Sequence, residues 1–125
     1  MAGSKTVLFV EDDRSISEMY ARALTRAGYE VDFSYDGDDA LKVLSTKTYD
    51  LILLDIMMPG KTGIEVLEAL RGPDGKGAPD TKIVILTNLA QKKASLEALK
   101  AEADGYIIKA DVVPSQLVEV IGKII

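Results

Sequence analysis

The sequence predicts a single α/β domain with a parallel sheet. Two observations predict it: five short apolar runs alternate with helix-length amphipathic segments, and most of the runs are continuous. Continuous apolar runs bounded by turn residues are typical of strands that are buried on both faces of a parallel sheet. A strand–helix order repeated five times places helices on both faces of that sheet, with right-handed crossovers. The 125 residues suffice for one such domain and not for two.

The predicted strands differ in how they expose their two faces. In the second strand apolar residues alternate with polar ones, so Val31 and Phe33 share one face. The third strand is wholly apolar, which favours a position inside the sheet. The five predicted strands are Thr6–Val10, Glu30–Ser34, Leu51–Leu54, Lys82–Leu86 and Gly105–Ile108.

The first predicted helix carries apolar residues at steps of three and one, which places them on one helix face. Gly28 follows, where a helix end favours a residue without a Cβ atom, and Pro114 marks the start of the last helix. The apolar residues of the first helix are Ile16, Met19, Tyr20, Ala23, Leu24 and Ala27. The other predicted helices are Asp38–Thr46, Gly63–Arg71, Gln91–Ala103 and Ser115–Ile125, and Gly72–Asp80 is predicted to be a mobile surface loop.

The composition excludes several classes of protein. A hydrophobic content of 47% predicts a folded chain, and a net charge of -5 argues against a surface that binds nucleic acid. The absence of Cys and His excludes disulfides, thiol nucleophiles, typical zinc sites and histidine bases. Without an apolar run long enough to span a bilayer, and without a signal peptide, we expect a cytoplasmic domain. Met1–Ser4 is interpreted as a start residue with a cloning remnant, and Lys5–Ile125 as the domain.

Acidic residues follow two of the predicted strands. Glu11, Asp12 and Asp13 come directly after the first strand and Asp55 after the third. Ligands of open α/β sheets bind beyond the carboxyl ends of the strands, where the strand order reverses, so an order 2-1-3-4-5 would bring Glu11, Asp12 and Asp55 together. Each carboxylate pair at ~4 Å costs about 4 kcal/mol at an effective dielectric constant near 20. The cluster is tolerable with a hard divalent cation such as Mg²⁺ or Mn²⁺, or with some of the acids protonated.

Two further polar residues face the same predicted edge of the sheet. Thr87 follows the fourth strand with a hydroxyl donor, and Lys109 follows the fifth with a mobile cation. Each residue alone has an ordinary interpretation: an Asp after a strand is commonly a helix cap or turn residue, which is the favoured interpretation for Asp13. Thr87 alone is a strand-end threonine and Lys109 alone a solvated charge. Together, an acid cluster, a hydroxyl and an ammonium indicate a site for a phosphoryl group and its metal.

The sequence resembles the receiver domains of two-component response regulators, including chemotaxis receivers, from Lys5 to Ile125. The resemblance implies a flavodoxin-like, doubly wound (βα)5 fold with the strand order 2-1-3-4-5, the order of a chemotaxis receiver. It lies in an acid pair after the first strand, a phosphoacceptor strand with its loop, a helix-opening glycine, a strand that ends in a hydroxyl, and a last strand with an aromatic residue and a lysine. These motifs are Val7–Asp13, Leu51–Gly60, Gly63, Ile85–Asn88 and Gly105–Lys109.

The resemblance assigns a role to each candidate residue. It implies that Asp55 is the phosphoacceptor, that Lys109 pairs with Asp55 and then with the phosphoryl oxygens, and that Thr87 bonds a phosphoryl oxygen after transfer. Tyr106 is implied to be the switch aromatic. The implied cofactor is Mg²⁺, with Mn²⁺ able to substitute; its implied protein ligands are Glu11, Asp12, Asp55 and the backbone carbonyl of Met57.

The implied function is a phosphorylation switch and not an enzyme acting on other substrates. The phosphoryl donor is a histidine kinase or a histidine phosphotransfer protein, and the switched surface comprises Gln91–Ala103, Gly105–Ile108 and Ser115–Ile125. This surface would control a downstream protein or a fused output domain, or form a homodimer; whether the domain acts alone or comes from a longer protein stays open. An exposed apolar patch for a partner and scattered surface residues are equal alternatives for Val112, Val113, Val118 and Ile125.

Some positions depart from the family pattern. Ala110 stands where most receivers have proline, so we expect a trans peptide bond after Lys109 and an altered following loop. Asn88 replaces a smaller residue, and apolar Met57 and Leu89 are expected to shield an acyl phosphate from water. The alternative functions are a pseudo-receiver that binds proteins independently of phosphorylation, and a flavin carrier or enzyme on the same scaffold. The acids after the first strand would repel a flavin phosphate, which argues against the last.

Overall fold

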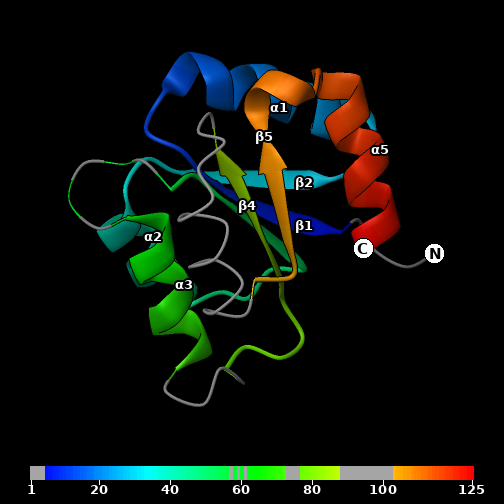
Figure 1. The fold of residues 1–125 in the computed structure, drawn as a ribbon. Helices are drawn as coiled ribbons and strands as arrows, with labels where there is room; N and C mark the ends of the chain where they lie inside the picture. The colour runs from blue at the N-terminus through cyan, green and yellow to red at the C-terminus, as the bar shows by residue number, and fades with distance from the viewer. Residues whose placement is uncertain (1–4, 57, 59, 61, 73–76, 88–102) are drawn as a thin grey trace.

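A five-stranded parallel sheet forms the centre of the computed structural model, which describes residues 5–56, 58, 60, 62–72, 77–87 and 103–125 (Figure 1). The strand order is β2-β1-β3-β4-β5, which confirms the predicted 2-1-3-4-5 order. Four strands have the predicted bounds, and the fourth extends one residue further, to Thr87. The strands are β1 Thr6–Val10, β2 Glu30–Ser34, β3 Leu51–Leu54, β4 Lys82–Thr87 and β5 Gly105–Ile108.

Helices follow the strands as predicted wherever the structure describes the chain. The predicted helix Gln91–Ala103 lies outside the described residues, apart from Ala103. A short 3₁₀ turn, η1 Lys109–Asp111, joins β5 to the last helix. The helices are α1 Arg14–Arg26, α2 Gly37–Leu44, α3 Gly63–Arg71 and α5 Pro114–Ile124.

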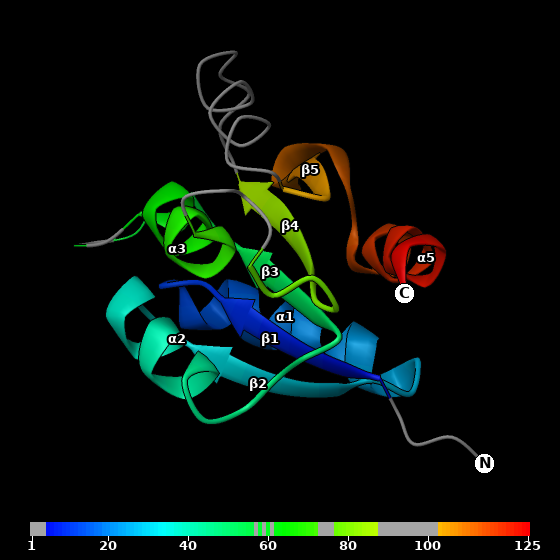
Figure 2. The same cartoon turned by 90° about the horizontal axis from the view of Figure 1, so that it is seen from below.

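The sheet is covered on both faces, with α2 and α3 on one side and α1 and α5 on the other (Figure 2). Because side chains alternate along a strand, β1 sends Leu8 and Val10 towards α2 and α3, and Val7 and Phe9 towards α1 and α5. The central strands β1, β3 and β4 are buried on both faces, which explains their continuous apolar sequences. The edge strand β2 has only half-buried Val31 and Phe33 on the α1 side, as its alternation predicts.

Helix ends have the capping residues that their sequences indicate. Asp13 is the N-cap of α1 and accepts a hydrogen bond from the Ile16 amide at 3.1 Å, which confirms its interpretation as a cap. Gly28, just beyond the end of α1, has φ +101°, a conformation that favours glycine. The buried face of α1 is Ser17, Tyr20, Ala21 and Leu24. Met19 is 46% exposed, so its assignment to the core face was wrong.

Arg71 fastens the loop that follows α3. Its buried guanidinium donates to the carbonyl oxygens of Gly77 at 3.0 Å and Ala78 at 2.8 Å, and to that of Thr81 at 3.2 Å. The same group pairs with Asp104, just before β5, at 2.6 Å. The described part of the predicted mobile loop is therefore anchored to the segments that precede β4 and β5.

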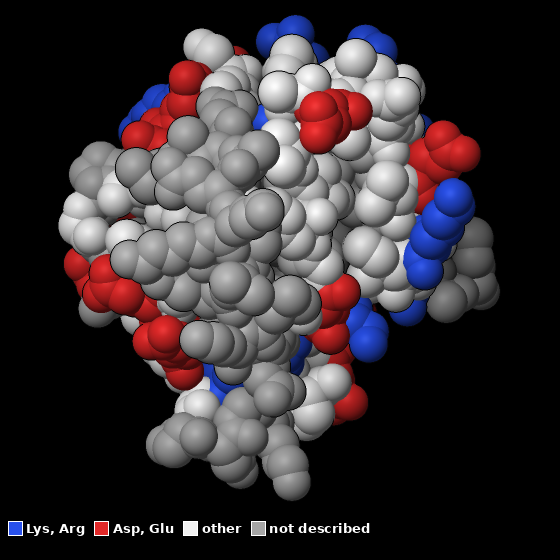
Figure 3. Space-filling model, viewed as in Figure 1, with Lys and Arg blue, Asp and Glu red and all other residues white. Residues whose placement is uncertain are grey.

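The apolar residues near the C-terminus do not form one exposed patch. Val118 and Ile125 are partly buried against the core on the α1 side, and Val113 is the strongly exposed member at 55%. In Figure 3 uncharged residues nevertheless occupy much of the described surface over β5 and α5, with charged side chains of both signs around it. None of the described helices has the length and apolar character that a membrane span requires.

Candidate functional site

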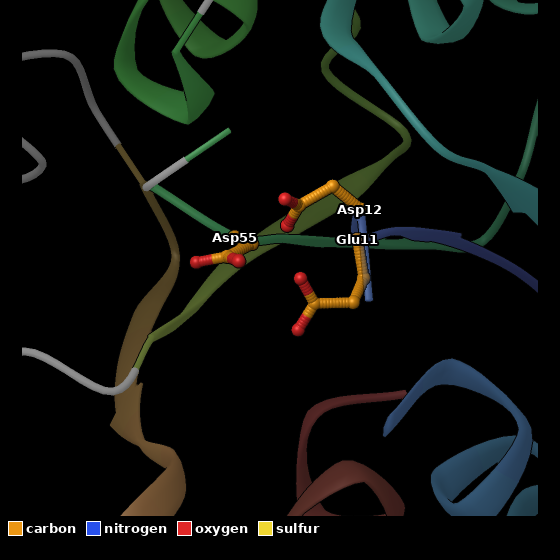
Figure 4. Close-up of side chains that lie close together, drawn as sticks. All are labelled: Glu11, Asp12 and Asp55. Carbon is orange, nitrogen blue, oxygen red and sulfur yellow. The ribbon is translucent and has the colours of Figure 1, made fainter. Parts of the chain in front are cut away.

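Three carboxylates meet at the carboxyl edge of the sheet. Strands β1 and β3 are neighbours with Val10 paired to Leu54, so the residues that follow each strand lie side by side. The Asp55 amide donates to the Val10 carbonyl at 2.9 Å, which extends the pairing to the first residue beyond β3. One carboxylate oxygen from each of Glu11, Asp12 and Asp55 lies within 4.8 Å of the others (Figure 4).

The cluster is buried on one side and open on the other. Glu11 is 1% and Asp55 6% exposed, whereas Asp12 is an exposed residue. In Figure 4 the three side chains extend into a common space beyond the ends of β1 and β3. The cluster therefore has two buried members, Glu11 and Asp55, and one exposed member, Asp12.

Lys109 brings a cation into this cluster from the end of β5. Its ammonium pairs with Glu11 Oε1 and lies 3.4 Å from Asp55 Oδ2. The side chain is buried, and this burial lowers the pKa of Lys109 to about 8. The two neighbouring carboxylates act in the opposite direction, because an adjacent negative charge favours the ammonium form.

The charges at the site are unequal. Among the described residues three carboxylates face one ammonium, which leaves two negative charges in excess when all are ionised. Carboxylate oxygens are hard ligands, and two of these three residues are buried where water screens their repulsion poorly. The residues present therefore fit a hard divalent cation in charge and in ligand type.

Gly63 allows α3, the helix that follows Asp55 in the chain, to approach the site closely. A Cβ atom at this position would lie 2.2 Å from the Asp55 carbonyl oxygen, which backbone atoms cannot tolerate. The Gly63 amide donates to the Ile56 carbonyl at 3.2 Å. The start of α3 is further fixed by a capping box, in which Thr62 and Glu65 bond each other's backbone amides. Asp55 is thus held by a backbone contact that only glycine permits.

The remaining candidate residues are described only in part. Thr87 ends β4, and its backbone pairs with Ile108, next to Lys109; its side chain lies outside the described residues. Tyr106 is half-buried and packs against the core on the α2–α3 side. Met57, proposed for a carbonyl ligand, lies outside the described residues, as do Asn88 and Leu89.

Sequence reasoning missed a contact that Tyr20 makes near the site. Tyr20 was assigned only to the core face of α1, yet its hydroxyl donates to the Val112 carbonyl at 3.3 Å, just beyond the turn that Lys109 begins. A tyrosine at a core position is the signal, because its hydroxyl requires a partner when buried. Within the described chain every peptide bond is trans, including that between Lys109 and Ala110, as predicted.

Comparisons with known proteins agree with this geometry. Residues 7–122 match the family described as the response regulator receiver domain. The transcriptional regulatory protein DltR of Streptococcus agalactiae is 41% identical over 103 residues, which are 82% of this chain and 44% of DltR. The response regulator MprA of Mycobacterium tuberculosis is 36% identical over 106 residues, 85% of this chain and 44% of MprA. The chain thus spans less than half the length of these curated relatives.

Solved structures show the same fold. A CheY-like response regulator receiver domain protein from Methanospirillum hungatei JF-1 superposes with a TM-score of 0.88 at 32% identity, over 97% of this chain and 93% of that one. The response regulator TrrA of Thermotoga maritima, solved in complex with Mg²⁺-BeF, has a TM-score of 0.84 at 36% identity and covers 97% and 99% of the two chains.

Proposed function

The chain belongs to the family of response regulator receiver domains, and from this premise we propose that it accepts a phosphoryl group on Asp55 in a reaction that requires Mg²⁺. The observation that carries the proposal is the cluster of Glu11, Asp12 and Asp55 with Lys109 among them. A cluster with excess negative charge attracts a divalent cation, and the ammonium draws an incoming anion to the same place.

Glu11, Asp12 and Asp55 would hold the metal, together with the backbone carbonyl of Met57. A bound Mg²⁺ supplies charge neutralisation, so that a carboxylate and a phosphoryl group can approach each other. That the relative TrrA was solved in complex with Mg²⁺-BeF supports magnesium as the metal. Mn²⁺ is expected to substitute, because it prefers the same oxygen ligands.

Asp55 is the nucleophile in the proposed reaction. One of its carboxylate oxygens forms a bond to phosphorus while the bond between phosphorus and the donor's imidazole nitrogen breaks, and that nitrogen afterwards takes up a proton from water. The transition state of phosphoryl transfer is loose, so the protein contributes mainly position and charge. Lys109, 3.4 Å from Asp55 Oδ2, is placed to follow the negative charge onto the phosphoryl oxygens.

The phosphorylated state would be transmitted through residues beside the site. We assign Thr87 to a hydrogen bond with a phosphoryl oxygen and Tyr106 to the inward turn that follows. Thr87 ends β4, the neighbour of β5, and Tyr106 lies on β5 itself. The surface formed by Gln91–Ala103, β5 and α5 would therefore change its shape. The uncharged surface over β5 and α5 suits a protein partner, an output domain or a second copy of the domain (Figure 3).

The phosphoryl donor would be a histidine kinase or a phosphotransfer protein, because the chain has no histidine of its own. The chain spans 44% of the length of two curated relatives, which are named a transcriptional regulatory protein and a response regulator. We propose that the domain signals to a partner or an output region by docking and does not act on a substrate.

The proposal is tested by incubating the protein with Mg²⁺ and a small acyl-phosphate donor, then measuring its intact mass. We expect a gain of one phosphoryl group that hydroxylamine removes and that Asp55→Asn abolishes. Asp13→Asn is the matched control. It removes the charge of an acid that neighbours the cluster but lies outside it, and asparagine keeps the cap of α1. No Mg²⁺-dependent gain with any of several donors would refute the proposal and favour binding that is independent of phosphorylation.

A further inference from the structure

We propose that Tyr20 is a positioning residue that holds Lys109 in the site through the turn that follows β5. The inference rests on the proposed function, since the position of Lys109 matters to it only if Asp55 is phosphorylated. Tyr20 touches none of the reacting groups and acts through the backbone.

Tyr20 lies on the buried face of α1, between the sheet and α5. It is 3% exposed, and its ring stacks on Phe9 of β1 with the ring centroids 6.1 Å apart. Its hydroxyl donates to the Val112 carbonyl at 3.3 Å across 92 positions of sequence. A buried hydroxyl without a partner is unfavourable, so the ring's burial favours the arrangement in which Val112 stays within reach.

Val112 closes the turn that begins at Lys109. Its amide donates to the Lys109 carbonyl at 3.3 Å. Within the turn, Ala110 and Asp111 are exposed and give it little packing. Val112 thus connects two hydrogen bonds in series, one to the backbone of Lys109 and one to the buried helix α1.

The two residues that Tyr20 contacts, Phe9 and Val112, are near in sequence to the two members of the ion pair in the site. Phe9 is two residues before Glu11, and Val112 is three residues after Lys109. Glu11 and Lys109 are themselves joined as a buried pair. One side chain therefore braces both the strand that leads to the carboxylate and the turn that follows the ammonium. β5 is an edge strand with every residue only half-buried, so Lys109 depends on contacts of this kind for its placement.

Tyr20→Phe removes the hydroxyl and keeps the stacked ring. One neutral hydrogen bond changes an equilibrium by about two- to ten-fold, so we expect the phosphorylation rate at saturating donor and Mg²⁺ to fall by about two- to ten-fold. The KM for the donor should stay unchanged, because Tyr20 is buried and cannot reach the donor. Amide exchange at Val112 should accelerate by a similar factor. Tyr20→Leu should lose more, because the stack on Phe9 is then lost as well.

Tyr29→Phe is the matched control. Tyr29 packs against the same part of the core as Tyr20, and among the described residues its hydroxyl has no hydrogen-bond partner. Its removal should leave the rate and the exchange of Val112 unchanged. An unchanged rate at saturating donor in Tyr20→Phe, or an equal loss in Tyr29→Phe at the same melting temperature, would overturn the inference. A wild-type protein that accepts no phosphoryl group would instead refute the proposed function, so the two failures are distinguishable.

Discussion

Asp55→Asn is expected to stabilise the fold in the absence of divalent cations while it removes the phosphoacceptor. Asp55 is 6% exposed and belongs to a cluster with more negative than positive charge. Asparagine has nearly the same shape and no charge. The substitution therefore isolates the electrostatic cost of an ionised carboxylate at this position from its packing.

The magnitude follows from two distances. At an effective dielectric constant of about 20, the ammonium of Lys109 at 3.4 Å attracts the Asp55 carboxylate by about 5 kcal/mol. The Glu11 carboxylate, within 4.8 Å, repels it by at least about 3.5 kcal/mol. The exposed Asp12 adds a smaller repulsion that water screens. Among these described charges the terms nearly cancel, so they offset little of the desolvation of the buried carboxylate. We expect the variant to be more stable by about 1–2 kcal/mol.

Urea and thermal unfolding with and without Mg²⁺ measure this difference. Without metal, the melting temperature of Asp55→Asn should exceed that of the wild type by about 3–8 °C. Mg²⁺ at a hundred times its dissociation constant should stabilise the wild type by about 2.7 kcal/mol. It should stabilise the variant less, because one anionic ligand is gone. The difference in stability between the two proteins should then narrow or reverse as Mg²⁺ is added.

Two results would contradict the reasoning. A variant that is less stable than the wild type without metal would show that Lys109, and not the other acids, determines the electrostatic environment of Asp55. An equal gain from Mg²⁺ in both proteins would show that the metal binds elsewhere. Asp13→Asn serves again as the control, since it removes a charge outside the cluster and keeps the helix cap.

Three further predictions concern other buried or paired charges. Lys109→Met leaves two buried carboxylates without their cation and should cost about 3 kcal/mol in urea unfolding without metal, a loss that Mg²⁺ should partly reverse; a loss below about 1 kcal/mol would contradict this. Arg71→Met removes the donor of four hydrogen bonds and should also cost about 3 kcal/mol, whereas the exposed Arg22→Met should change the unfolding free energy by less than about 0.5 kcal/mol. A hydrogen bond from Lys47 and a second one from a tyrosine lower the pKa of Asp32 below 3.8. This carboxylate therefore contributes stability above that pH, and the contribution is lost as the pH falls through the folded-state pKa. In acid unfolding, the difference in unfolding free energy between the wild type and Asp32→Asn should therefore shrink below about pH 4. A difference that stays constant to about pH 2 would refute this prediction.

The sheet could be predicted from the sequence because burial leaves a direct pattern in it. The wholly apolar Leu51–Leu54 has its predicted bounds, since both of its faces are covered. Helix boundaries were less accurate: α2 begins at Gly37 and not at Asp38, because the cap is Asp36. The apolar stripe of α1 was also misplaced at Met19, because periodicity alone does not show how far a helix is rotated towards the sheet. The strand order came from the resemblance, since no local pattern records which strands are neighbours.

The acids of the site could be predicted because they lie at strand ends, whereas the ion pair between Glu11 and Lys109 could not. The resemblance implies that Lys109 pairs with Asp55, and the structure adds Glu11 as a second partner of the ammonium. That choice depends on the lengths and directions of side chains from β1 and β5, which lie on opposite sides of β3 and β4. Arg71 was missed for a similar reason. An arginine at the end of a helix is usually solvated, and only the folded loop supplies the carbonyl groups that bury it.

The excess of negative charge is itself the feature that allows this site to respond to two ligands. Lys109 neutralises one carboxylate, so a dication can neutralise the other two, and the cluster then no longer repels an anion. If Lys109 were absent, a dication would leave the site negative and a phosphoryl group would meet repulsion. A second ammonium among these carboxylates would satisfy the apo cluster and leave it with little affinity for metal. The instability that three buried or adjoining acids impose on the apo domain is therefore the same quantity that drives metal binding, and unfolding experiments and phosphorylation kinetics should detect it together.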